Sequence, residues 1–169
     1  MSQETIYFAM GCFWGVEKAL KQLPGVHDTE VGYMGGHAPT PSYTQVCTGL
    51  TGHAETVRVQ ADTDAIDQLL QFFFENHDPT QVDGQGNDHG TQYRSVIFTT
   101  TEDAFKAAQK WREIAQDKLS AAGYGPVTTT IYGPSEVPEF WPAEEYHQDY
   151  LEKNPDGYCP VHATGIKCG

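Results

Sequence analysis

Basic residues are scarce in this chain of 169 residues. Ten lysines and arginines stand against 23 aspartates and glutamates, which gives a formal net charge of −13. A surface of that charge repels a polyanion or an anionic bilayer, so nucleic acid and membrane lipid are excluded as expected partners. The simplest use of so large a charge excess is solubility.

Long apolar runs are also missing. No stretch approaches the length of a membrane span, and the N-terminus lacks the basic segment and apolar run of a secretory signal. We therefore expect a cytoplasmic protein. Cysteines are few, and a disulfide scaffold is excluded because there are only Cys12, Cys47, Cys159 and Cys168. In a reducing compartment such cysteines are expected to be free, catalytic or metal-bound.

The hydrophobic pattern predicts one catalytic domain, residues 1–169, of the α+β class. Its length and its 38% of hydrophobic residues suit a single substantial core. Alternating apolar residues predict strands, over 5–10, 26–33, 54–61, 93–99 and 127–132. Helical spacing predicts helices, over 14–22, 64–76, 102–122 and 143–153. Because strands and helices mix without strict alternation, we expect a two-layer sandwich with helices packed on a mixed sheet.

Three segments lack a regular pattern. Residues 35–53 and 77–92 are rich in glycine and polar residues and are predicted to be long loops, which in a compact domain are usually functional. Residues 154–169 are predicted to form a mobile coil tail. Its two cysteines, Cys159 and Cys168, are nine positions apart, which is not the spacing of a zinc knuckle. A thiol relay is favoured over a mutual disulfide.

Cys12 lies where a predicted strand passes into a predicted helix. The N-terminus of a helix lowers the pKa of a thiol through its dipole and free amides. The flanking Gly11 and Gly15 permit a tight turn and close approach of a substrate. Phe13 and Trp14 follow, and they could anchor the helix in the core or form an apolar wall beside the sulfur. By position alone, a small buried cysteine without chemistry is equally well supported.

Four segments, in the same order along the chain, resemble the peptide methionine sulfoxide reductase A family. They are GCFWG (11–15), GLTGHAE (49–55), QGNDHGTQYRS (85–95) and GYC (157–159). The resemblance extends from about residue 6 to residue 168 and implies an enzyme that reduces methionine S-sulfoxide, free or in proteins, and so repairs oxidative damage. It implies thioredoxin or another dithiol as reductant, with no metal and no organic cofactor. We further expect a monomer.

The resemblance also implies which residues perform the reaction. Cys12 would attack the sulfoxide sulfur and become a sulfenic acid, while Glu55 protonates the sulfoxide oxygen. Tyr43 and Tyr93 would donate hydrogen bonds to that oxygen, and Asp88 would line the site. The chemistry requires such donors, because the oxygen is a poor leaving group until it is protonated. Phenols stay protonated at neutral pH and can serve as donors.

The remaining roles concern substrate binding and recycling. Phe13 and Trp14 would hold the S-methyl group, and a carboxyl group near them would be poorly solvated, which raises its pKa. Cys159 would form a disulfide with Cys12, and Cys168 would pass that disulfide to the reductant. Cys47 has no role in this scheme. Taken alone, the polar strand around Glu55 favours a solvated surface acid instead.

Two other functions fit parts of the pattern. A cysteine hydrolase could use Cys12 with a histidine such as His147 and an acid, but this function assigns no role to the tail cysteines. A zinc-binding interaction module is conceivable with seven histidines, but no paired ligand spacing is present. We expect His53, His89 and His147 to be structural, since a thiol ionised by its setting needs no base.

Overall fold

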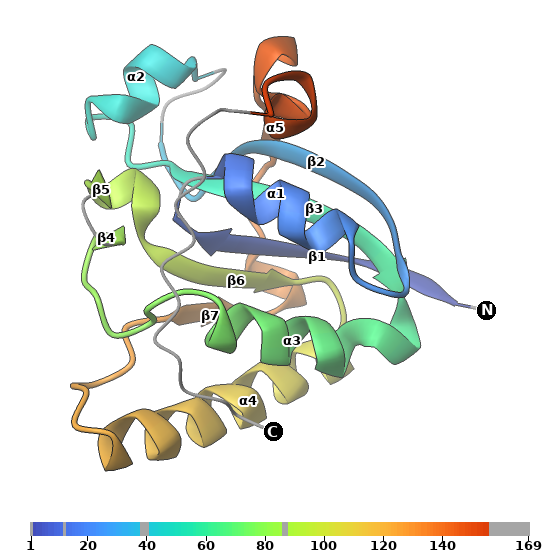
Figure 1. The fold of residues 1–169 in the computed structure, drawn as a ribbon, viewed down its shortest axis with the longest axis vertical. Coiled ribbons are helices and arrows are strands. Elements are labelled where there is room, and N and C mark those ends of the chain that lie inside the picture. Colours follow the sequence, from blue (N-terminus) through green and yellow to red (C-terminus); the bar gives the residue numbers. More distant parts are fainter. Residues whose placement is uncertain (1, 12, 38–40, 86–87, 156–169) are drawn as a thin grey trace.

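A six-stranded sheet forms the centre of the molecule, in the strand order β7-β6-β1-β3-β2-β8 (Figure 1). The computed structural model describes residues 2–11, 13–37, 41–85 and 88–155. Its longest strands, β1 (Gln3–Met10), β2 (Val26–Met34) and β3 (Ala54–Asp62), pair antiparallel with β3 in the middle. The outer strands are β6 (Ser95–Thr99), β7 (Thr130–Tyr132) and β8 (Trp141–Pro142). Because β6 and β7 run parallel, the sheet is mixed, as expected.

Helices α1 (Phe13–Lys21), α3 (Ile66–Glu75) and α4 (Glu102–Ala121) lie on one face of this sheet (Figure 1). Their apolar sides form one core with inward-facing residues of the strands. The helices contribute Leu20, Leu70, Phe73 and Leu119, and the strands contribute Ile6, Phe8 and Val57. Helix α4 begins where the Thr101 hydroxyl accepts a bond from the Ala104 amide, and two acids follow in its first turn. The predicted helical layer is therefore confirmed.

The other face of the sheet is covered by irregular chain. A second apolar cluster there joins Ala9, Met34, Ala54, Val96 and Phe98 of the strands with Tyr7, Tyr132, Val137 and Phe140. The chain between β7 and β8, which includes the 3-10 helix Pro134–Glu136, supplies this cover. The α+β class with one helical layer agrees with the sequence. None of the helices in the described ranges is long and apolar enough to cross a membrane.

The two long loops contain short elements that the sequence pattern did not predict. Helix α2 (Tyr43–Cys47) interrupts the first loop and begins with a capping box, in which Ser42 and Gln45 each bind the other's backbone amide. The second loop contains the two-residue strands β4 (Gly84–Gln85) and β5 (Asp88–His89) and the 3-10 helix Thr91–Tyr93. Elements this short lack a detectable period.

The predicted helix over 143–153 is wrong in extent. It is divided into a 3-10 helix, Glu145–His147, and a short helix α5 (Tyr150–Lys153). Asp149 lies between them with φ of 54°, in the left-handed region. Tertiary contacts hold it there, because its amide donates to Glu17 over 2.8 Å and its carboxylate pairs with Lys21. The predicted strand 127–132 is likewise shorter, since only Thr130–Tyr132 pairs with β6.

Candidate active site

Those predicted site residues that the structure describes gather at one end of the sheet, where β1 and β2 end and β3 begins. Cys12 falls between β1 and α1 in the sequence but lies outside the described residues, as do Cys159 and Cys168 in the tail. Tyr33 and Glu55 are direct cross-strand partners on β2 and β3. The positions of these two strands therefore place a phenol and a carboxyl group next to each other.

Glu55 is buried, with 1% of its surface exposed. Its Oε1 accepts a hydrogen bond of 3.3 Å from the backbone amide of Phe13, the first residue of α1. This amide is one of the donors that a helix leaves free at its N-terminus. The interpretation of Glu55 as a solvated surface acid is wrong, because α1 and its aromatic residues cover the start of β3. The carboxyl group thus lies beside the residue that follows Cys12.

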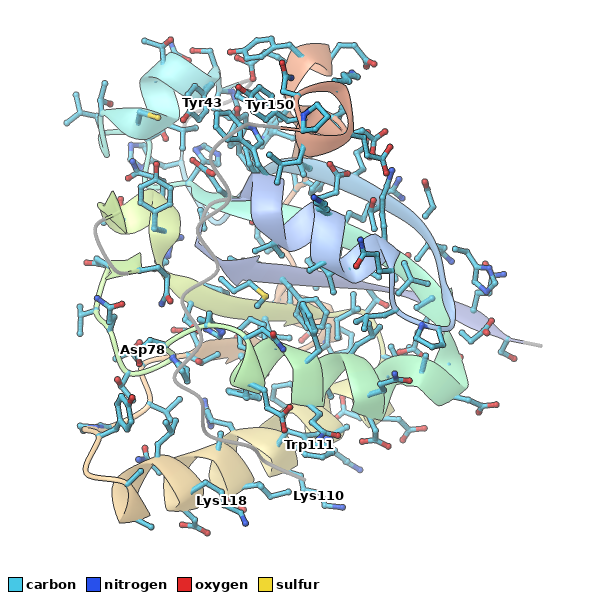
Figure 2. The ribbon with its side chains drawn as sticks, viewed as in Figure 1. Tyr43, Asp78, Lys110, Trp111, Lys118 and Tyr150 are labelled. Atoms are coloured by element: carbon cyan, nitrogen blue, oxygen red, sulfur yellow. The ribbon has the colours of Figure 1, made fainter. Side chains whose placement is uncertain are left out.

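Aromatic rings from three elements pack around this carboxyl group. The Tyr43 ring lies 6.5 Å from Phe13 and 6.5 Å from Trp14, with interplanar angles of 22° and 26°. Trp14 also stacks on Tyr150 at 3.9 Å. Figure 2 shows Tyr43 of α2 and Tyr150 of α5 at the same end of the molecule, opposite Trp111 of α4. The three elements are therefore joined by one aromatic cluster.

His147 lies behind these rings and is fully buried. Its ring centroid is 4.4 Å from that of Tyr43 and 5.3 Å from that of Phe13. Its Nδ1 accepts a hydrogen bond of 2.9 Å from the indole Nε1 of Trp14, so that nitrogen carries no proton. Burial lowers the pKa of His147, which favours the same neutral form. The expected structural role of this histidine agrees with its contacts.

Tyr43 keeps its proton at neutral pH. Burial raises the pKa of its phenol, and the neighbouring Glu55 carboxyl group raises that pKa further. Tyr93, at the end of the 3-10 helix Thr91–Tyr93, is close enough to Tyr43 to influence the same ionisation. Asp88 lies in β5, where its backbone pairs with Gln85, but its side chain is outside the described part of the chain. Tyr43, Tyr93 and Glu55 are therefore brought together.

The sequence patterns did not identify two residues of this site, Tyr33 and Glu144. The hydroxyl of the buried Tyr33 donates to Oε1 of Glu144 over 2.9 Å, and the backbone amide of Tyr43 donates to Oε2 over 3.0 Å. Burial alone would raise the pKa of Glu144, but these donors outweigh it and leave that pKa below its usual value. No local pattern marks either residue, because their partners are more than 100 positions apart.

A third residue is Gln85, which begins the 85–95 motif but was given no role, and which supports the turn before Cys12. Its side-chain amide donates to the Asp78 carbonyl over 2.6 Å and accepts from the Asp78 amide over 2.8 Å. Gly11 has φ of 106°, and a β-carbon built on it would lie 3.0 Å from Cγ of Gln85. The second long loop is thus packed directly against the residue that precedes Cys12.

Cys47 lies on the last turn of α2, near the same cluster. Desolvation raises the pKa of its thiol, and the Glu55 and Glu144 carboxyl groups raise it further, although a hydrogen bond with Tyr43 opposes them. A thiol with a raised pKa is a poor nucleophile at neutral pH. This agrees with the expectation that Cys47 does not react.

Comparison with known proteins decides the family. The family model for peptide methionine sulfoxide reductase matches residues 4–167. The chain belongs to the peptide methionine sulfoxide reductase family. Relatives named peptide methionine sulfoxide reductase MsrA include that of Corynebacterium kroppenstedtii, 51% identical over 98% of this chain and 77% of the relative. That of Rhodospirillum centenum is 52% identical over 98% of this chain and 75% of the relative. The family expected from the four sequence segments is confirmed.

Solved structures of the peptide methionine sulfoxide reductase family share this fold. Methionine sulfoxide reductase A of Corynebacterium diphtheriae superposes with a TM-score of 0.83 at 48% identity, covering 99% of this chain and 82% of its own. Mxr1 of Saccharomyces cerevisiae in its reduced form gives 0.83 at 38% identity, covering 95% and 91%. The predicted α+β fold is confirmed by these family members.

Membership of the peptide methionine sulfoxide reductase family disfavours both alternative functions. The hydrolase and the zinc module were each based on a subset of cysteines and histidines, whereas the family match spans nearly the whole chain. Within the described ranges, no group of three histidine, cysteine or acidic side chains is placed to hold a metal ion.

Proposed function

We propose that this protein reduces methionine S-sulfoxide to methionine, with Cys12 as nucleophile and Glu55 as proton donor. The observation that carries the proposal is the buried Glu55 carboxyl group, bound to the amide of Phe13. The carboxyl group contacts the residue that directly follows Cys12 in the sequence, and Phe13 is also one of the aromatic residues that would hold the substrate. A carboxyl group at this position is placed to deliver the proton that the reaction consumes.

The reduction step converts one sulfoxide and one thiolate into a thioether and a sulfenic acid. The Cys12 sulfur attacks the sulfoxide sulfur while Glu55 delivers a proton to the oxygen, which the phenols of Tyr43 and Tyr93 bind as donors. A bond between the two sulfurs forms and then breaks as the hydroxyl group moves from the substrate sulfur to Cys12. The sulfur–oxygen bond of the substrate breaks, the substrate sulfur keeps the electron pair, and Cys12 becomes Cys–SOH. Methionine sulfoxide is reduced by two electrons to methionine, and Cys12 is oxidised by two. We include Asp88 as a further polar residue lining this site.

Recycling uses thiols in the tail. Cys159 attacks the sulfenic acid, water leaves, and a Cys12–Cys159 disulfide forms. Cys168 exchanges into that disulfide and presents it to a thioredoxin, which reduces it. The yeast relative Mxr1 has been solved in complex with Trx2. That supports a thioredoxin as the class of reductant here. We propose that the enzyme is a cytoplasmic monomer of one domain, residues 1–169, that needs neither metal nor organic cofactor.

A thioredoxin-coupled assay with each sulfoxide epimer tests the reduction step. We expect turnover of the S epimer, none in Cys12→Ser, and a fall of about 10²–10⁴-fold in Glu55→Gln, the usual effect of removing a general acid. Glu145→Gln is the matched control, because its carboxylate is 92% exposed. Turnover that survives in Cys12→Ser would end this mechanism.

Mass spectrometry separates the reductase from a hydrolase. After one equivalent of methionine sulfoxide, without reductant, we expect the enzyme to become about 2 Da lighter as two thiols form a disulfide. Cys159→Ser should instead accumulate the sulfenic acid, about 16 Da heavier. A hydrolase would show neither change in mass. A separate metal analysis of the purified protein tests the zinc-binding interaction module, which stoichiometric zinc would favour.

A further inference from the structure

We propose that Glu144 is a positioning residue for the reduction step, whose carboxylate fixes the start of α2 and thereby holds the Tyr43 phenol beside Glu55. The inference rests on the proposed function, because it requires that Tyr43 donates to the sulfoxide oxygen. Glu144 itself is not proposed to touch the substrate.

One carboxylate joins three elements of the site. Its Oε1 accepts from the Tyr33 hydroxyl on β2, and its Oε2 accepts from the Tyr43 amide at the start of α2. Tyr33 is in turn the cross-strand partner of Glu55 on β3. Both oxygens are therefore used, and each is bound to an element that carries or adjoins a residue of the proposed reaction.

Apart from the contacts of the Tyr43 ring with its aromatic neighbours, helix α2 has few other anchors. It contains five residues, and of these Val46 alone is buried. A single turn of this length is not stable by itself in water. The capping box between Ser42 and Gln45 is internal to the turn and does not connect it to the rest of the protein. Glu144 connects the backbone of this turn to the rest of the protein, and an anion at a helix N-terminus is also favoured by the helix dipole.

The position of Glu144 is determined by the sheet. The amide of Ala143 donates to the Val31 carbonyl over 2.9 Å. The side chain of Gln148 then accepts from the Val31 amide over 3.0 Å and donates to its carbonyl over 2.9 Å. These bonds attach the segment on both sides of Glu144 to the edge of β2. A side chain held in this way transmits the geometry of the sheet to α2.

Loss of Glu144 leaves two donors without their partner. The Tyr33 hydroxyl is buried, and the Tyr43 amide loses the bond that fixes the first residue of α2. We expect α2 to shift and Tyr43 to lose its alignment with Glu55. A misplacement of about 1 Å in a catalytic group costs roughly 10²-fold in rate. Because the Tyr43 bond strengthens as charge grows on the sulfoxide oxygen, the rate should fall more than KM rises.

The test compares variants in a single-turnover assay of methionine formed, with no recycling reductant. We expect Glu144→Ala to lower the rate at saturating sulfoxide by about 10–100-fold. Glu144→Gln, which keeps one acceptor oxygen, should be intermediate, and the exposed Glu145→Gln should match the wild type. If Glu144 acted through its charge alone, Gln and Ala would be equally slow, which would overturn the proposal.

A double variant shows whether Glu144 acts through Tyr43. If it does, Glu144→Ala should add little to the loss already caused by Tyr43→Phe. If the rate losses of the two single variants multiply in the double variant, or if Glu144→Ala has the wild-type rate, the inference is overturned. A wild-type rate in Tyr43→Phe would instead refute the role proposed for Tyr43. Should Glu144→Ala fail to fold by circular dichroism, Tyr33→Phe removes only one of the two bonds and should give a smaller loss of the same kind.

Discussion

The indole of Trp14 and the imidazole of His147 are joined by a hydrogen bond of 2.9 Å, across 133 positions of sequence. The bond requires an unprotonated Nδ1, and burial lowers the pKa of His147 in the same direction. Together with stacking on Tyr150, it holds the indole in one orientation, two positions after the proposed nucleophile in the sequence. The segment that contains His147 and Tyr150 thus orients a side chain at the start of α1.

Replacing His147 should therefore weaken substrate binding. In His147→Phe the ring packing is kept but the acceptor for the Trp14 indole is lost. We expect KM for the sulfoxide to rise by about 5–10-fold, equivalent to one hydrogen bond of about 1 kcal/mol. Steady-state kinetics provide the measurement, and His27→Asn, which changes a part-exposed histidine on β2, is the control. An unchanged KM in His147→Phe would contradict the role of this bond.

The buried His77 should make the fold less stable in acid. Its Nδ1 and Nε2 bind the Phe73 carbonyl and Ser95 Oγ, and burial lowers its pKa from 6.5 to about 4. As pH falls from 6.5 to 4, the unfolded chain takes up a proton that the folded protein does not, so up to about 3 kcal/mol of stability is lost.

Urea denaturation at a series of pH values tests this assignment. His77→Gln should be less stable than the wild type at pH 7.5, because it cannot make both bonds. The difference between the two proteins should shrink as pH approaches 4, because Gln does not titrate. Parallel pH profiles for the two proteins would exclude His77 as the source of the acid dependence.

Glu17 should have the opposite pH dependence. It is 2% exposed, and burial raises its pKa above 4.5 despite bonds from Asp149 and Thr29. Above pH 4.5 the folded protein holds a proton that the unfolded chain releases, so this group costs stability as pH rises. We expect the stability of Glu17→Gln relative to the wild type, measured by thermal unfolding, to increase between pH 4.5 and pH 8. A difference that stays constant over that range would contradict the assignment.

Gly32 is required by the close approach of two strands and a ring. A β-carbon built on it would lie 2.5 Å from the Trp141 carbonyl oxygen and 2.4 Å from the Phe140 ring. Gly32→Ala should destabilise the protein by about 3 kcal/mol, the upper range of overpacking effects. Gly125→Ala is the matched control, because no atom lies within 4 Å of its β-carbon. Equal stabilities of the two variants would refute this explanation.

The regular part of the fold was predictable because its signals are local. The apolar residues of β3 alternate, those of α3 recur at helical spacing, and both elements lie where the pattern predicted them. The short elements were missed for the same reason, since α2, β4, β5 and β8 are each too brief to show a period. The predicted helix over 143–153 failed because tertiary bonds at Gln148 and Asp149 override its helical spacing.

The residues of the site also form two groups, those that sequence motifs identified and those that only contacts between distant segments reveal. The motifs around Cys12 and Glu55 identified the family and the proposed reacting groups from sequence alone. Tyr33, Glu144 and Gln85 act through partners distant in sequence or through backbone atoms, and neither kind of contact leaves a pattern in the residues nearby. The burial of Glu55 also depends on the tertiary packing, because α1 covers the face of β3 that Glu55 shares with Val57 and Val59.

The amino-acid sequence by itself determined the reductase family and the helical layer, and it supplied the residues proposed to react. These depend on side-chain identity and on repeats of a few positions, which are properties of the chain alone. Only the tertiary structure decided that Glu55 is buried against the Phe13 amide, that Trp14 is bound by His147, and that Glu144 connects α2 to the sheet. Such contacts exist only when segments far apart in the chain are folded together.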